Sequence, residues 1–155
     1  AEEQVRAHTY ALLGALLTAA PSAELLSTLA QVSLESGADG DFADAWRQLS
    51  IAAEHADLAG LEQESQDLFI GVGRGEVVPY GSWYMTGFLM DRPLAVLRAD
   101  LKRLGFERQE DVNEHEDDAG ALCETMAMLL GGGNDQEMQR QFFESHMGPR
   151  MKAFF

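Results

Sequence analysis

Hydrophobic residues recur at spacings of three and four along most of the chain, which is the period of an amphipathic helix. In the first half this spacing predicts a series of helices separated by proline and glycine. Their expected bounds are residues 3–18, a helix capped by Ser22 and ended by Gly37 and Gly40, a helix capped by Asp41 and ended by Gly60, and residues 61–70.

The middle of the chain predicts two more helices. Ser82 is expected to cap a short helix over residues 83–90. Asp91 and Pro93 then favour a new helix start, because a proline in the first turn loses no hydrogen bond. Gly105 is well placed to end this helix.

The end of the chain holds the strongest apolar signal. Residues 119–130 are almost wholly apolar, so they predict a central buried helix that the glycines at 131–133 end. Asn134 and Glu137 resemble a capping box that starts another helix. Its expected apolar face consists of Met138, Phe142, Phe143 and Met147.

No useful stretch alternates apolar and polar residues with the period of a strand, and no internal repeat is visible. We therefore expect an all-α fold, a single-domain helical bundle of about six to eight helices over residues 1–155.

Charge narrows the classes of partner. Eleven Lys and Arg against twenty-six Asp and Glu give a net charge of −15, which repels phosphate backbones and argues against nucleic acid. No run approaches the roughly 20 apolar residues of a membrane span, so we expect a cytoplasmic protein without membrane insertion. The single cysteine, Cys123, lies in an apolar run and is interpreted as a core residue.

Two stretches stand out as candidate binding chemistry. Residues 76–84 interrupt the helical pattern and place three aromatic rings beside a glycine. Residues 110–118 hold six acids and one histidine immediately before the central apolar helix. Acids in a first helical turn stabilise the helix, but mutual repulsion offsets that gain when so many stand together. We expect the two stretches to form one surface for a short cationic and apolar peptide.

Other chemistry finds little support in the residues. The histidines lie on separate segments without metal-ligand spacing, and Gly81-Ser82 is not part of a nucleophile elbow, so no metal, cofactor or catalytic residue is expected. Gly71, Gly73 and Gly75 alternate like a phosphate loop, but Glu76 stands where a dinucleotide fingerprint needs glycine. Nucleotide or small-molecule binding through residues 71–75 stays open as an alternative, as does a helical regulatory protein without a peptide ligand.

Several motifs together resemble the TorD/DmsD family of chaperones for molybdenum-containing oxidoreductases. Asp67-Leu68-Phe69 and Pro79-Tyr80-Gly81-Ser82-Trp83-Tyr84 match the family's first two elements, and Pro93, Leu97, Arg98 and Gly105 follow at the expected distances. The sequence departs from the family pattern at His115, Asp118 and Arg150, which replace Pro, His and Trp. The family's last one or two helices also have no counterpart in these 155 residues.

The resemblance implies an all-α, non-catalytic cytoplasmic chaperone that binds the twin-arginine signal peptide of an apoenzyme until its cofactor is inserted. The sequence around residues 74–84 is most similar to members that accompany formate dehydrogenases. The expected peptide-binding residues are Tyr80, Ser82, Trp83, Tyr84, Phe88, Glu114, His115, Asp117 and Asp118. Asp117 is expected to receive the cationic part of the peptide, with paired hydrogen bonds to a guanidinium. The apolar residues at the end of the chain further suggest a homodimer formed by helix exchange.

Overall fold

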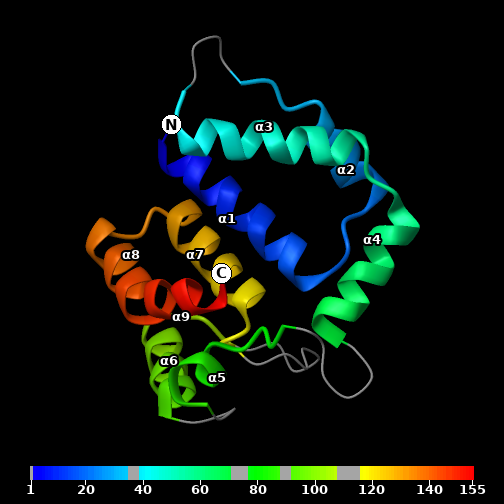
Figure 1. The fold of residues 1–155 in the computed structure, drawn as a ribbon. Helices are drawn as coiled ribbons and strands as arrows, with labels where there is room; N and C mark the ends of the chain where they lie inside the picture. Colours follow the sequence, from blue (N-terminus) through cyan, green and yellow to red (C-terminus); the bar gives the residue numbers. More distant parts are fainter. Residues whose placement is uncertain (1, 35–38, 71–76, 88–91, 108–115) are drawn as a thin grey trace. The chain divides into compact units, whose positions relative to one another are not determined.

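The computed structural model describes residues 2–34, 39–70, 77–87, 92–107 and 116–155, without the side chains of Gly81, Ser82 and Tyr84. These residues form helices joined by short loops, and their only β-type pairing is an isolated bridge between Tyr80 and Asp118 (Figure 1). The expected all-α fold class is therefore confirmed. None of the described helices is both long and apolar enough to cross a membrane.

The chain divides into two compact units, Ala19–Glu76 and Ala1–Thr18 together with Val77–Phe155. The first unit contains α2 (Ala23–Ala30), α3 (Asp41–Glu54), α4 (Leu58–Ser65) and a π-helical turn over Gln66–Ile70. Helices α2 and α3 pack together, and the Ser50 hydroxyl donates to the Ala30 carbonyl over 3.3 Å. Ser22 caps α2 as expected, because its side chain accepts from the Leu25 amide.

Three expected boundaries in this unit are wrong. Helix α2 ends at Ala30, with Gln31 as its C-cap, well before the glycines that were expected to end it. Asp41 is the first residue of α3, and the N-cap position belongs to Gly40, whose φ of 99° only glycine adopts readily. Gly60 does not break a helix, because it lies inside α4. The Asp57 side chain caps α4 by accepting from the Gly60 amide over 2.9 Å.

The second unit is built on the pair α1 (Glu2–Thr18) and α7 (Ala119–Gly131), which pack along each other. Close approach is possible because glycines face each other at the contact. A Cβ on Gly120 would lie 3.2 Å from the Gly14 carbonyl oxygen and would also meet the Thr18 hydroxyl. Helix α7 buries most of its side chains, so the expected central helix is confirmed.

Helices α5 (Gly81–Thr86), α6 (Arg92–Arg103), α8 (Gln136–Phe142) and α9 (Gly148–Phe154) complete this unit, with a π-helical turn over Phe143–Met147 between α8 and α9. The core lies between these helices and α7 (Figure 1). Its fully buried side chains include Leu94, Leu97, Leu122, Cys123, Met126, Leu129, Phe142 and Met147. The expected role of Cys123 as a core residue is confirmed.

Three further details differ from expectation in this unit. Ser82 lies within α5, which Tyr80 precedes as N-cap and which ends at Gly87 with a φ of 77°. The N-cap of α8 is Asp135, whose side chain accepts from the Glu137 amide. The predicted capping box of Asn134 and Glu137 is therefore wrong. Phe143 is 41 % exposed, whereas Phe142 and Met147 of the same expected face are buried. Consecutive helical side chains point about 100° apart, so Phe142 and Phe143 cannot both face the core. Gly105 ends α6 as expected, with a φ of 83°.

Candidate functional site

Residues 77–84, called the aromatic loop below, lie beside residues 116–118, the described end of the acidic run at 110–118, although the two stretches are far apart in the chain. The Ala119 amide donates to the Pro79 carbonyl over 2.8 Å, and Tyr80 and Asp118 form an antiparallel bridge. The backbone thus joins the start of α5 to the start of α7. This is the arrangement that a single surface made from both stretches requires.

Asp118 stabilises the start of α7. Its Oδ1 accepts from the Gly120 amide over 2.8 Å and from the Ala121 amide over 3.2 Å, and the residue is buried. An acid at this position satisfies amides that have no helical partner and complements the positive end of the helix dipole. Its carboxylate therefore has a structural role whether or not a ligand binds nearby.

Asp117 lies deeper than the sequence suggested, with an exposed fraction of 0 %. It lines a small cavity of about 10 Å³ together with Pro79 and Arg150. Arg150 is itself 3 % exposed, and burial lowers the pKa of its guanidinium while the Asp117 carboxylate opposes that shift. The charge of Asp117 thus faces a cation that belongs to the same chain.

Arg150 and His146 connect three helical segments through buried hydrogen bonds. The Arg150 Nη1 donates to the His146 carbonyl over 2.7 Å, and its Nη2 donates to the Pro93 carbonyl over 3.1 Å. The His146 Nε2 lies 2.7 Å from the Asp100 Oδ2. A guanidinium has no acceptor, so the 3.3 Å contact from Nη1 to the His146 Nδ1 makes that nitrogen the acceptor and Nε2 the donor.

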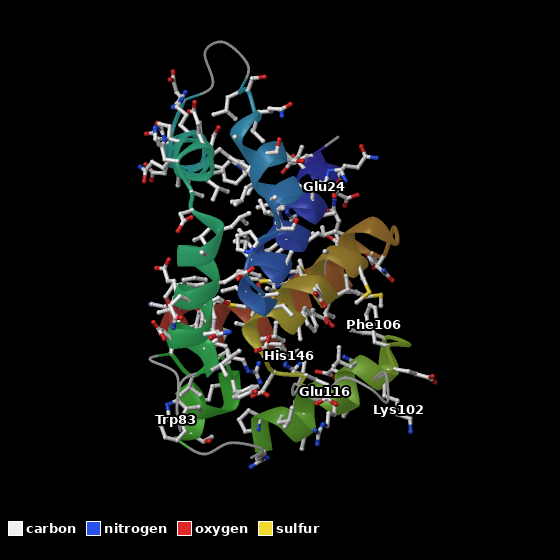
Figure 2. The ribbon with its side chains drawn as sticks, turned by 90° about the vertical axis from the view of Figure 1, so that its right-hand side faces the viewer. Glu24, Trp83, Lys102, Phe106, Glu116 and His146 are labelled. Atoms are coloured by element: carbon white, nitrogen blue, oxygen red, sulfur yellow. The ribbon has the colours of Figure 1, made fainter. Side chains whose placement is uncertain are left out.

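Of the three acids at residues 116–118, Glu116 is the one whose side chain reaches the surface. Its side chain is 16 % exposed, and its Oε2 accepts from the Arg98 Nε over 3.0 Å. Arg98 lies on α6 and is 41 % exposed, so water competes for this ion pair. Figure 2 shows Glu116 over α6 and Trp83 on α5, and the Trp83 side chain is partly buried.

Among the expected site residues, the structure pairs the backbone of Tyr80 with Asp118 and places Asp117 beside Pro79, and Trp83 follows in α5. The side chains of Ser82 and Tyr84, and the whole of Phe88, Glu114 and His115, lie outside the described part, as do residues 71–75 of the candidate phosphate loop. Sequence reasoning left Arg98, Asp100 and Arg150 out of the site. Arg150 had drawn notice only as a departure from a tryptophan.

The chemistry that this region offers is binding. Among the described residues no group of three or more His, Cys, Asp and Glu is placed to hold a metal ion. Burial, with a smaller contribution from the nearby Asp118 carboxylate, raises the pKa of the Cys123 thiol to about 12, so a thiolate is strongly disfavoured. Apolar rings beside acids are instead suited to a ligand that is both cationic and apolar.

Comparison with known families places the chain in a family. The model of the family described as nitrate reductase delta subunit matches residues 35–155, which is most of the chain. The match confirms the likeness to TorD-type chaperones that the motifs indicated, without specifying a subgroup. No curated protein matches the chain as a relative.

Proposed function

The chain belongs to the nitrate reductase delta subunit family, and from that premise we propose that it is a cytoplasmic chaperone for one particular molybdenum-containing oxidoreductase. The family consists of non-catalytic chaperones that assist the maturation of molybdoenzymes. The chaperone holds the apoenzyme while the cofactor is inserted. Its ligand on the apoenzyme is the twin-arginine signal peptide, which carries two arginines before an apolar segment.

The observation that carries this proposal is the pairing of the aromatic loop with the acidic start of α7. The hydrogen bond from the Ala119 amide to the Pro79 carbonyl joins the backbone of the aromatic loop to the start of α7, next to Asp117 and Asp118. A twin-arginine peptide has the complementary order, cationic and then apolar, and such complementarity favours the right partner over wrong ones. The net charge of −15 adds a long-range attraction for a basic segment.

Within this surface, Glu116 and Glu114 receive the arginines, and Tyr80, Ser82, Trp83, Tyr84 and Phe88 contact the apolar segment; His115 is a further candidate contact. Asp117 and Asp118 contribute negative charge from buried positions. Direct pairing of Asp117 with a peptide arginine requires the residues that cover it to move, since its exposed fraction is 0 %. Glu116 is therefore the first carboxylate to test.

Calorimetric titration with a synthetic twin-arginine signal peptide tests the proposal. We expect Glu116→Gln to weaken binding about fivefold, since a partly exposed charge pair is worth about 1 kcal/mol. Trp83→Ala should weaken it tenfold or more if this ring is an anchor. Glu144→Gln is the matched control, because Glu144 also pairs with an arginine on a helix surface, Arg140, but lies away from the aromatic loop.

A peptide that binds all three variants and the wild type equally would contradict the proposed surface. A wild type that binds neither the peptide nor an apoenzyme would contradict the chaperone function and favour a helical regulatory protein. A thermal-shift screen with nucleotides addresses the remaining alternative at residues 71–75, because a ligand of the native state raises the melting temperature.

The client enzyme remains to be assigned. The description of the matching family mentions nitrate reductase without specifying a subgroup, and the sequence around residues 74–84 is most similar to chaperones of formate dehydrogenases, so these are the two candidate clients. Purification from native cells without crosslinking, followed by identification of the co-purifying oxidoreductase, distinguishes the two. The same preparation, analysed by sedimentation, tests whether the chain forms the helix-exchanged homodimer.

A further inference from the structure

A pocket of about 370 Å³ lies between α6 and the segment formed by α8 and its π-helical turn. Its volume falls in the range of small-molecule sites. Its wall consists of Asp100, Arg103, Leu104, Met138, Gln141, Phe142, Ser145 and His146. None of these residues belongs to the peptide-binding surface proposed above, so the pocket is a separate feature of the same unit.

The fixed charge of the pocket wall is negative. The Asp100 side chain is 28 % exposed and is held by the His146 Nε2 at 2.7 Å. Arg103 also contacts Asp100, over 3.0 Å, but its side chain is 70 % exposed and lies on the same face of α6 three residues later. An exposed pair of this kind contributes little, so the guanidinium of Arg103 can turn into solvent while Asp100 stays in place.

His146 adds no positive charge to this wall. Its Nδ1 accepts from the Arg150 guanidinium and its Nε2 donates to Asp100, which together define a neutral ring. Burial also lowers the pKa of His146, while the hydrogen bond that the ring donates to Asp100 opposes this shift. Because both ring nitrogens are engaged, the ring cannot activate the neighbouring Ser145 as a nucleophile. The pocket wall therefore offers surface for a ligand but no Ser145–His146 nucleophile pair.

The rest of the wall is apolar with polar groups at its edge. Leu104, Met138 and Phe142 supply aliphatic, thioether and aromatic surface, and a cation near a thioether or ring gains further attraction. Gln141 and Ser145 are exposed and can orient a polar group. A ligand that satisfies this wall has one cationic end for Asp100 and an apolar body for the remaining surface.

We propose that this pocket is a binding site for an ammonium group carried on an apolar or aromatic stem. The ammonium pairs with Asp100 and displaces Arg103 toward solvent, while the stem lies against Leu104, Met138 and Phe142. A free organic amine and a lysine side chain of a bound protein share this chemistry.

Titration of the full chain with three probes of similar size tests the proposal: phenethylamine, 3-phenylpropanol and 3-phenylpropionate. We expect the amine to bind best and the carboxylate worst, measured by heat or by amide shifts of α6 and α8 in NMR spectra. Asp100→Asn should remove the preference for the amine. If the three probes bind alike, or if the carboxylate binds best, the proposal is wrong.

Arg103→Ala gives a test that does not depend on the buried hydrogen bonds, because Arg103 is mostly exposed. Loss of the competing guanidinium should tighten amine binding about two- to fivefold, the range expected from an exposed ion pair. An unchanged or weakened affinity for the amine would overturn the proposal. Arg140→Ala, which removes an exposed arginine outside the pocket wall, is the matched control and should change little.

A competition experiment identifies the source of the ammonium group. If a protein side chain occupies the pocket, saturation with phenethylamine weakens binding of the client apoenzyme, and this effect disappears in Asp100→Asn. If a free amine is the ligand, the apoenzyme and phenethylamine bind together. Either result supports the amine site, and the binding of the twin-arginine peptide alone reports separately on the proposed function.

Discussion

Among single residues, the buried His146 links the stability of the fold to pH. Burial holds its pKa in the folded protein below the ordinary value of 6.5, so the unfolded chain binds a proton more readily in the interval between the two values. The stability that the neutral ring contributes is fully present above that ordinary pKa and is lost as the pH falls through this interval.

We expect the free energy of unfolding to fall on acidification from pH 7.5 to 5.5, with a slope that approaches about 1.4 kcal/mol per pH unit for one proton. Urea unfolding at a series of pH values measures this dependence of the free energy of unfolding on pH. His146→Gln should be less stable overall but show a shallower slope over the same interval. Parallel slopes for wild type and variant would mean that other groups cause the dependence.

Asp117 supplies a second prediction at this scale. If Asp117 received the cationic part of the peptide from an exposed position, a change to asparagine would be expected to weaken peptide binding and leave the fold intact. Its burial beside Arg150 changes that expectation, because an amide leaves a buried cation facing no opposite charge. We expect Asp117→Asn to lower the free energy of unfolding by about 1–3 kcal/mol, measured by urea titration. An unchanged stability would show that Arg150 does not depend on this carboxylate.

At the scale of helices, the close contact of α1 with α7 requires a residue without a side chain at Gly120. A Cβ on Gly120 would meet the Thr18 hydroxyl and would lie 3.0 Å from the Asp118 Oδ1, the oxygen that caps α7. We expect Gly120→Ala to destabilise the protein by about 1–3 kcal/mol, the usual cost of overpacking. Thermal or urea unfolding measures the change.

Gly131 is the control within the same helix. No atom of the described structure lies within 4 Å of a Cβ placed there, so Gly131→Ala should be neutral or stabilise the helix by up to about 1 kcal/mol. Equal losses at the two positions would indicate a general intolerance of α7 to substitution and would contradict the packing argument.

Helices with long apolar faces could be predicted from the sequence, and their exact starts could not. The apolar run after Ala119 leaves little alternative to a buried helix. The sequence pattern predicts Asp41 and Asn134 as N-cap residues. In the structure the neighbouring residues, Gly40 and Asp135, occupy the N-cap positions. Capping requires a non-helical backbone angle at one particular residue, and adjacent polar residues compete for it.

For the molecule as a whole, the meeting of two distant stretches could be anticipated, while the depth of Asp117 could not. Aromatic and acidic residues each suggested a ligand, and their joint chemistry suggested one surface. The burial of Asp117 depends on Arg150, which comes from the last helix and carries no local signal of its partner. Contacts between residues far apart in the chain decide how deeply such a residue is buried, so its burial could not be predicted from the sequence alone.

The two compact units should also differ in how readily they open. Helix α7 buries most of its side chains, whereas the buried residues of α2 and α3 are limited to Leu29, Ala43 and Ala53. Amide exchange is slowest where opening costs nearly the full stability. We expect amides of α7 to exchange at least tenfold more slowly than those of α2 and α3 in native-state hydrogen exchange. Equal protection in all three helices would instead indicate a single cooperative unit.

The π-helical turn at Phe143–Met147 gives the end of the chain one place where its length can change. Such a turn holds one residue more than an α-helical turn, and each residue of an α-helix advances the side chains by about 100°. We expect the loss of one surface residue there, such as Glu144, to let the turn close into a regular helix and to leave Arg150 facing the Pro93 carbonyl. A second deletion finds no extra residue to remove, so it would turn every side chain that follows away from its present partners.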